Sequence, residues 1–198
     1  MDFCGTQTYR NLARSFAGES QAGMRYQLVA KQAKAMEYQV LSDAIKGIAK
    51  NETYHAKAFY EELTRRAKEP VKIKLDADYP YWFGTLEENL GYAAEGEHEE
   101  HVRIYADFAS VAQEEGFESI AALYRRIAEV EKHHEIVFSY LCEAYKGGTL
   151  YRADHPMLWI CSECGYMHTA EEAWKVCPVC KAKQGYVELH LPFKKEEL

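Results

Sequence analysis

The sequence predicts a mainly α protein, in which a four-helix bundle is followed by a small metal-bound domain of β strands and loops. Four long stretches carry apolar residues at helical spacing. Two copies of Glu-x-x-His lie on that apolar face, and two Cys-x-x-Cys pairs follow near the C-terminus. We therefore divide the 198 residues into a bundle (1–148), a linker (149–158) and a metal-bound module (159–198).

The four predicted helices span residues 6–33, 36–67, 85–115 and 117–146, and none of them contains a proline. Pro70 and Pro80 lie in the connection 68–84, which is too long for a tight turn and is expected to cross the bundle. Gly116 separates the third and fourth helices, and the pair Gly147–Gly148 is a typical helix end.

Each predicted helix carries acidic residues in the middle of its apolar seam. The two Glu-x-x-His motifs lie 79 residues apart, and a lone glutamate precedes each of them, with 78 residues between the two. Two lone glutamates and two Glu-x-x-His motifs are the known ligand set of two-metal sites in helix bundles, which is the pattern matched here. We expect a repeated helical hairpin whose halves place two metal positions symmetrically at mid-bundle. The candidate ligands are Glu19, Glu52, His55, Glu97, Glu131 and His134.

A simpler interpretation is that these residues are solvated helix charges. It is disfavoured because they fall on the apolar seam of all four helices, where burying an unpaired charge costs several kcal/mol or more. Ligation by many carboxylates and few imidazoles suits iron or manganese. Glycines directly before the lone glutamates, Gly18 and Gly96, either leave room for the site or allow close helix packing.

Two nearby histidines need separate treatment. Glu95 and His98 also form a Glu-x-x-His pattern, but at about 100° per residue they point away from the face of Glu97. We reject this pair as ligands. His101 follows Glu97 by four residues and could approach the seam.

The cysteine pairs Cys161/Cys164 and Cys177/Cys180 predict a closed tetrahedral site of four sulfurs. Their spacing fits either zinc or a single iron ion. A module of roughly 40 residues is too small for a sufficient core, so we expect it to need its metal to fold. Cys4 and Cys142 are expected to be ordinary thiols, and His168 and His190 are expected to be surface residues.

Net charge and hydropathy exclude some classes of binding partner. A net charge of −7 and a pI near 5.7 argue against nucleic acid as the main partner. No apolar run approaches the roughly 20 residues of a membrane span, and the first residues lack a secretory signal, so we expect a cytoplasmic protein without a membrane partner. Because there is no GxGxxG or P-loop pattern, we expect no nicotinamide-binding site within this chain.

Together these motifs resemble the rubrerythrin family over nearly the whole chain. The resemblance includes Ala17–Ala22 leading to Arg25-Tyr26, and Glu52-x-x-His55 followed by Ala56-Lys57. It continues through Gly96-Glu97-x-x-Glu100 leading to Tyr105, and through Glu131-x-x-His134-Glu135. The sequences Cys-x-x-Cys-Gly-Tyr and Cys-Pro-x-Cys resemble the rubredoxin module of that family. The fold implied is a ferritin-like four-helix bundle followed by a rubredoxin-like domain.

The resemblance also implies roles for individual residues. Glu19, Glu52, Glu97 and Glu131 would be ligands of a non-haem di-iron centre, Glu52 and Glu131 as bridges, and His134 would bind the second iron. His55 and Glu100 would exchange on the first iron, histidine in the reduced state and glutamate in the oxidised state. Tyr26 and Tyr105 would donate hydrogen bonds to the ligands. Iron, with zinc as the alternative, would occupy the site of Cys161, Cys164, Cys177 and Cys180.

The activity implied is reduction of hydrogen peroxide to water in defence against oxidative stress. Electrons would pass from an NAD(P)H-dependent reductase through the rubredoxin-type iron. The chain would form a homodimer or higher homo-oligomer, in which subunits could exchange helices. Two alternatives remain open at this point. One is a ferroxidase or iron-handling protein of the ferritin type, and the other is a structural or regulatory metal protein with zinc on its cysteines.

Overall fold

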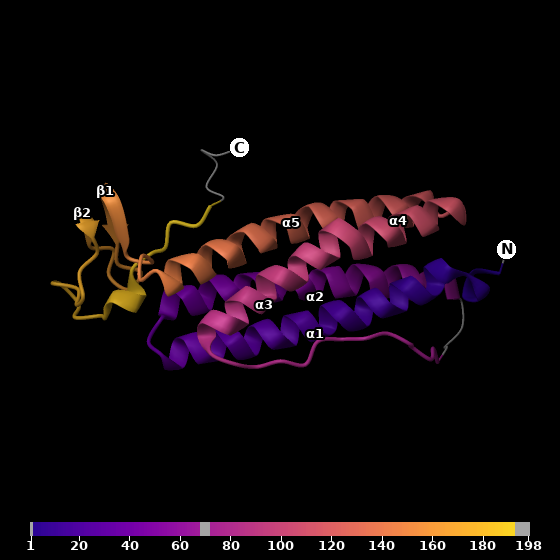
Figure 1. Cartoon of the computed structure of the whole chain (residues 1–198), viewed down its shortest axis with the longest axis horizontal. Coiled ribbons are helices and arrows are strands. Elements are labelled where there is room, and N and C mark those ends of the chain that lie inside the picture. Colours follow the sequence, from indigo (N-terminus) through magenta and orange to yellow (C-terminus); the bar gives the residue numbers. More distant parts are fainter. Residues whose placement is uncertain (1, 68–71, 193–198) are drawn as a thin grey trace.

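The computed structural model describes residues 2–67 and 72–192. It is mainly helical, with a small two-stranded domain at one end of a four-helix bundle, as the sequence predicts (Figure 1). Among the described residues, none of the helices has the length and hydropathy that a membrane crossing requires. The elements are α1 (Gln7–Ala35), α2 (Gln39–Ala67), α3 (Leu86–Glu99), the π-helical turn η2 (Glu100–Ile104), α4 (Tyr105–Glu114), α5 (Glu118–Lys146), β1 (Arg152–Ile160) and β2 (Met167–Glu172), with short 3₁₀ turns at Phe3–Gly5 (η1) and Gln184–Tyr186 (η3).

Local chemistry explains where the helices begin and turn. The Thr6 side chain accepts a hydrogen bond from the backbone N–H of Tyr9 and so caps α1. Thr85 and Glu88 form a reciprocal capping box at the start of α3. Gly116, with φ of +82°, supplies the left-handed residue that the turn between α4 and α5 requires.

The predicted third helix, 85–115, is not one continuous α-helix. The turn η2 interrupts it with π-helical geometry between α3 and α4. Tyr105 follows Glu97 by eight positions, whereas Tyr26 follows Glu19, the equivalent pair in the first half, by seven. At about 100° per residue an extra residue would rotate Tyr105 out of the core. The wider turn absorbs that residue, and Tyr105 is only 2% exposed.

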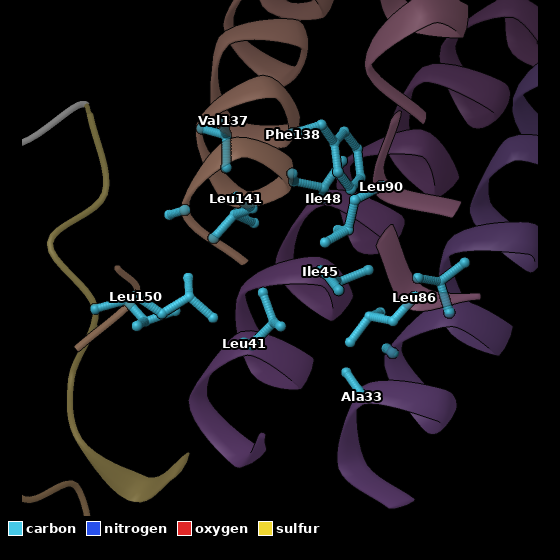
Figure 2. Close-up of a cluster of buried hydrophobic side chains, with 14 of the residues drawn as sticks. Ala33, Leu41, Ile45, Ile48, Leu86, Leu90, Val137, Phe138, Leu141 and Leu150 are labelled. Atoms are coloured by element: carbon cyan, nitrogen blue, oxygen red, sulfur yellow. The ribbon is translucent and has the colours of Figure 1, made fainter. Parts of the chain in front are cut away.

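The helices pack as two hairpins, α1 with α2 and α3–α4 with α5. Their apolar residues form two separate clusters. One lies toward the strand-containing end and includes Leu41, Leu90 and Phe138 (Figure 2). The other lies toward the opposite end and includes Phe59 and Tyr124. The acidic residues of the seam occupy the interval between the two clusters.

The connection between the hairpins runs along α1 over residues 72–85 (Figure 1). The Tyr79 hydroxyl donates to the carbonyl of Arg14 at 3.0 Å, and the Gln32 amide donates to the carbonyl of Gly84 at 3.0 Å. These hydrogen bonds hold the connection against α1. Pro70, which the sequence places in this connection, lies outside the described residues.

The module docks directly on the end of the bundle. Strand β1 starts at Arg152, inside the segment 149–158 predicted as a linker, because it pairs in antiparallel register with β2. Trp159 and Val187 join the apolar cluster that includes Leu41. Lys183 reaches the Glu37 carboxylate at the α1–α2 turn, with Nζ 2.6 Å from Oε2.

Gly185→Ala is expected to destabilise this docking by about 1–3 kcal/mol, as overpacking typically does. An added Cβ at Gly185 would lie 1.8 Å from the carbonyl oxygen of Glu37. Urea unfolding followed by tryptophan fluorescence measures the effect. Gly47→Ala is the control, since its Cβ would meet nothing within 4 Å in the middle of α2. Equal stability of the two variants would contradict the tight approach.

Candidate metal centres

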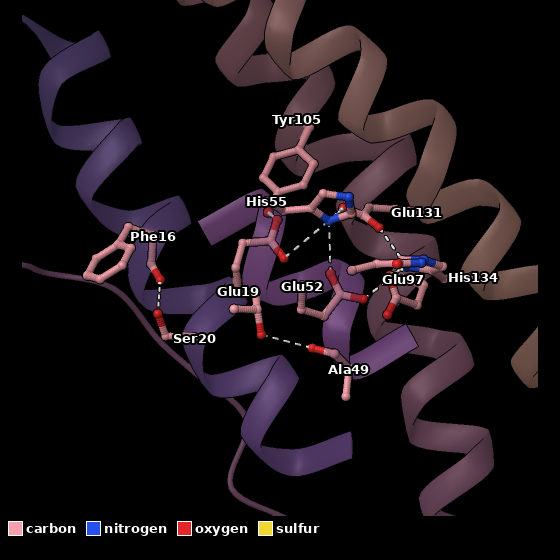
Figure 3. Close-up of polar contacts among 12 residues, drawn as sticks. Phe16, Glu19, Ser20, Ala49, Glu52, His55, Glu97, Tyr105, Glu131 and His134 are labelled. Carbon is pink, nitrogen blue, oxygen red and sulfur yellow. Dashed lines mark hydrogen bonds and ion pairs between the residues drawn. The ribbon is translucent and has the colours of Figure 1, made fainter. Parts of the chain in front are cut away.

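Six of the predicted ligand side chains converge at mid-bundle (Figure 3). The four carboxylates are almost completely inaccessible to solvent, at 0–1% exposure, and His134 is 4% exposed. They form two groups that share two members, Glu52 and Glu131. The first group is Glu19, Glu52, His55 and Glu131, and the second is Glu52, Glu97, Glu131 and His134.

Each shared carboxylate directs one oxygen to each histidine. Glu52 places Oε2 at 3.0 Å from Nδ1 of His55 and Oε1 at 3.0 Å from Nδ1 of His134. Glu131 places Oε1 at 2.9 Å from Nδ1 of His55 and Oε2 at 2.8 Å from Nδ1 of His134. Each of these two carboxylates thus has one oxygen in each half of the site.

The other two glutamates each belong to one group only. Glu19 Oε2 lies 3.8 Å from Nδ1 of His55, and Glu97 Oε2 lies 3.6 Å from Nδ1 of His134. They therefore stand in terminal positions, one for each half of the site.

Hydrogen bonding within the protein does not satisfy this cluster. An imidazole nitrogen carries at most one proton, yet each Nδ1 faces oxygens from three carboxylates. Both oxygens of Glu131 and Nδ1 of His134 are buried without a hydrogen-bond partner among the described residues. Buried groups of this kind cost several kcal/mol unless a cation or a proton compensates them. The donor set fits two adjacent cations.

The electrostatics agree with that fit. Burial, opposed only in part by the histidine contact, raises the pKa of Glu97 to about 8 and that of Glu19 well above its usual range. Burial also opposes ionisation of Glu52, but contacts with His134 and His55 outweigh it and lower its pKa to about 2. Burial disfavours charged histidine, yet the surrounding carboxylates raise the pKa of both imidazoles to about 12. Without metal, protons must take the place of cations.

Two tyrosines hold the terminal carboxylates across the bundle. The hydroxyl of Tyr26, on α1, donates to Oε1 of Glu97 on α3, and the hydroxyl of Tyr105, on α4, donates to Oε1 of Glu19 on α1. Each hydrogen bond leaves Oε2 of its glutamate turned toward the histidines. Partners of this kind orient metal ligands.

Glu100 lies apart from both ligand groups. It starts the π-helical turn, is partly buried, and borders a cavity of about 500 Å³ together with Gly18, Gly96 and Tyr105. Burial, followed by the charge of Glu19, raises the Glu100 pKa well above its usual range. An added Cβ at Gly96 would meet nothing within 4 Å, and one at Gly18 would meet only Cε1 of Tyr79, at an ordinary contact distance of 3.7 Å, so neither glycine is required for close helix packing.

Glu95 and His98, which we rejected as ligands, and His101 also lie outside the two ligand groups. Glu95 and His98 are exposed. His101 is partly buried and places Nε2 at 2.6 Å from Oε2 of Glu135, on α5. It therefore contacts the neighbour of a predicted ligand and none of the ligands themselves.

Sequence patterns missed Asn51, whose side-chain amide lies 3.1 Å from Nε2 of His134. With Nδ1 directed at the carboxylates, Nε2 carries the ring proton, and a half-turn of the amide presents Oδ1 to accept it. Such partners fix the orientation of a ligating histidine. No periodic signal marks Asn51, because it is one residue before Glu52 and meets His134 only when α2 packs near α5.

Asn51→Leu is therefore expected to weaken metal retention by about 10–100-fold, the usual effect of losing such a partner. Asn51→Asp keeps an acceptor and should retain the metal as the native chain does. Iron remaining during a timed chelator challenge gives the comparison. If the leucine variant held iron as firmly as the native chain, His134 would not depend on this contact.

The second centre is built by two cysteine turns in the module. The sulfurs of Cys161 and Cys180 are 3.7 Å apart, as are those of Cys164 and Cys177, and all four lie within 4.8 Å of one another. In each turn a residue with positive φ follows the second cysteine, Gly165 at +72° and Lys181 at +66°. Four converging sulfurs fit one tetrahedral metal ion.

Comparison with known proteins agrees with both centres. Residues 10–142 match the rubrerythrin family model, and residues 159–188 match the model described as the rubrerythrin, rubredoxin-like domain. The chain is 38% identical over 185 residues to Rubrerythrin-1 of Clostridium acetobutylicum, covering 93% of this chain and 95% of that protein.

Solved structures show the same fold. Mixed-valence nigerythrin superposes with a TM-score of 0.62 at 24% identity, covering 94% of this chain and 87% of that one. The bacterioferritin of Desulfovibrio desulfuricans gives 0.64 at 23% identity over 72% of this chain and 82% of its own. The carboxylate–histidine groups and the four cysteines fit a di-iron centre and a rubredoxin-type iron site. The chain belongs to the rubrerythrin family.

Proposed function

We propose that this chain is a non-haem di-iron peroxidase that reduces hydrogen peroxide to water, with electrons relayed through its cysteine-bound iron from an NAD(P)H-dependent reductase. The observation that carries the proposal is that Glu52 and Glu131 each direct one oxygen to each of the two histidines, in the same chain as four converging cysteine sulfurs. The proposal accounts for both centres with one reaction.

When bound, the two irons supply the two electrons that peroxide reduction requires. Glu52 and Glu131 hold the two positions together, each through both of its oxygens. Tyr26 and Tyr105 keep the terminal carboxylates oriented. The cavity beside Glu100 and Tyr105 offers a small peroxide an approach to the site.

Glu100 has a specific part in this proposal. His55 faces the carboxylates here and Glu100 does not belong to their group, which is the arrangement proposed for the reduced centre. In the oxidised centre Glu100 would take the place of His55, so that an anionic ligand would compensate the added positive charge. The π-helical turn that begins at Glu100 supplies the local freedom for this exchange.

Electron delivery calls for a second copy of the chain. The module lies past the end of α5 (Figure 1). From His134 to Lys146 alone, α5 advances about 18 Å at about 1.5 Å per residue. We propose that a homo-oligomer brings the module of one subunit near the di-iron site of its partner.

Stopped-flow spectroscopy tests the activity. The anaerobically reduced protein is mixed with hydrogen peroxide and, separately, with dioxygen, while the absorption of oxidised iron–thiolate is followed. Fast return with peroxide and slow return with dioxygen is expected. The reverse preference would overturn the peroxidase proposal and favour a ferroxidase. If the colour failed to return with either oxidant, the proposed relay through the module would be wrong.

Glu100→Ala is expected to lower peroxide turnover by about 10–100-fold, an effect comparable to losing a close partner of a metal site. The iron coordination of the reduced protein should stay unchanged, because His55 holds that position. Glu114→Ala is the control, since Glu114 is exposed at the C-terminal end of α4 and does not line the cavity beside Glu100. Native turnover, together with identical coordination in both redox states, would contradict the ligand exchange.

The alternative is an iron-handling protein. The bacterioferritin similarity supports it only at the level of fold, and the electron-carrying module would then have no clear purpose. Ferrous iron added in air separates the two functions. A ferroxidase of the ferritin type continues to take up iron beyond its resident ions, whereas the proposed peroxidase stops once its sites are full.

A further inference from the structure

Three side chains from three elements meet outside the paired carboxylate site. His98 on α3 places Nδ1 at 3.0 Å from Oε1 of Glu135, and His101 on η2 places Nε2 at 2.6 Å from Oε2 of the same residue. The two imidazole rings meet edge to face, with centroids 5.3 Å apart. One ligand atom from each residue lies within 4.8 Å of the others. Two imidazoles and a carboxylate thus converge on one point.

We propose that His98, His101 and Glu135 bind one divalent transition-metal ion of the Zn²⁺ or Fe²⁺ class, at a site separate from the paired centre. Imidazole nitrogens and a carboxylate oxygen suit these ions, whereas Mg²⁺ and Ca²⁺ prefer oxygen ligands throughout. Three protein ligands leave at least one coordination position for water, which is the composition of an open zinc site. None of the three residues belongs to either paired-site group.

Solvent access fits an exchangeable ion. The side-chain exposures are 55% for His98, 26% for Glu135 and 16% for His101. One ligand is thus free to move, while the other two are held by packing. Metal bonds of about 2.0–2.1 Å place tetrahedral ligand atoms about 3.3 Å apart. An ion therefore requires the contact of His98 with Glu135 to open by about 0.3 Å and that of His101 with Glu135 by about 0.7 Å.

His98 lies in the last turn of α3, and His101 follows three residues later in the π-helical turn. Residues three apart share a helix face, and here that face meets Glu135 on α5. Glu135 follows His134 and, about 100° further round α5, points away from the paired site. Helix α5 thus directs His134 into the paired site and Glu135 toward His98 and His101.

Zinc binding to the full-length, iron-loaded, oxidised protein tests this site. After incubation with a small excess of Zn²⁺ and desalting, metal analysis should give one zinc ion per chain with the iron content unchanged. Zinc-edge X-ray absorption should show nitrogen and oxygen ligands including imidazole, without sulfur. His98→Gln should weaken binding at least about tenfold, since it removes a direct ligand rather than an outer partner.

The variants separate this site from the rest of the protein. His98 is exposed, so His98→Gln is expected to fold and to keep its iron; Glu135→Gln provides a second, independent loss of a ligand. His155→Gln is the matched control, because His155 pairs with a carboxylate, Asp154, but belongs to none of the possible metal-ligand groups among the described residues. Failure to retain zinc, sulfur in the zinc shell, or native affinity in His98→Gln would each overturn the proposal, whatever the protein's peroxidase activity.

Discussion

Glu52→Ala should empty the paired site and reduce peroxide turnover by more than about 100-fold, while the cysteine-bound iron stays in place. Glu52 is the residue with one oxygen at 3.0 Å from each imidazole, so its loss removes a ligand from both cation positions together. Loss of a residue that only hydrogen-bonds to a metal ligand typically lowers metal affinity or activity by about 10–100-fold, and loss of a ligand shared by both positions should lower them further. Iron analysis and the iron–thiolate spectrum report the two centres separately.

Two further variants isolate the cause. Glu52→Gln preserves the shape of the side chain and removes its charge, so a similar loss would assign the effect to the carboxylate rather than to packing. Glu61→Ala, on the same helix with a side chain that is 63% exposed, should leave both centres intact. If Glu52→Ala retained iron in the paired site, the bridging assignment would be wrong.

Removing the metal should make the bundle less stable as pH rises from about 5 to 8. In the metal-free fold the Glu97 pKa is raised to about 8, while that of an unfolded glutamate is near 4.5. Between these values the folded state binds more protons, so the free energy of unfolding falls with pH by up to about 1.4 kcal/mol per unit for this group. Glu19 acts in the same direction.

The two histidines of the paired site also make the metal-free fold less stable as pH rises. Because the pKa values of His55 and His134 are raised to about 12, their contribution is fully present below about 6.5 and is lost as pH rises through 12. Glu52, with its pKa lowered to about 2, acts in the opposite direction only below about 4.5. Between pH 5 and 8 these glutamates and histidines of the paired site therefore do not oppose one another.

Urea unfolding of metal-free and iron-loaded protein at pH 5.5, 6.5 and 8 measures this slope. The iron-loaded protein should lose stability toward acid instead, because protons compete with the metal for the same carboxylates. A metal-free protein that became more stable with rising pH would show that the buried acids are not held protonated. That result would also contradict the inference that the buried carboxylates and histidines at mid-bundle need cations to compensate their charge.

Much of the architecture follows from spacing within single segments. Residues three apart on a helix share a face, so Glu52 with His55 and Glu131 with His134 were predicted to act together before any fold was known. The cysteine turns are equally local, because two residues between cysteines suffice to aim both sulfurs at one metal. The family resemblance rests on these local motifs, and the comparisons confirm it.

The predicted helices are close to those in the structure where local signals are strong. The fourth was expected at 117–146 and α5 spans Glu118–Lys146, between Gly116 and the glycine pair that follows. The third was expected as one helix, and the π-helical turn interrupts it. The extra residue is visible in the sequence as a spacing of eight rather than seven, but helical periodicity alone does not say how the backbone absorbs it.

By itself, the sequence determined which side chains share a face and which metal chemistry they suit, because both depend on residue type and local spacing. Only the tertiary structure decided which faces meet. It set Tyr26 against Glu97 and Tyr105 against Glu19, and it started a strand inside the predicted linker. It also brought Asn51 to His134. Such contacts join residues far apart in the chain, and they form only when the packing of whole helices brings those residues together.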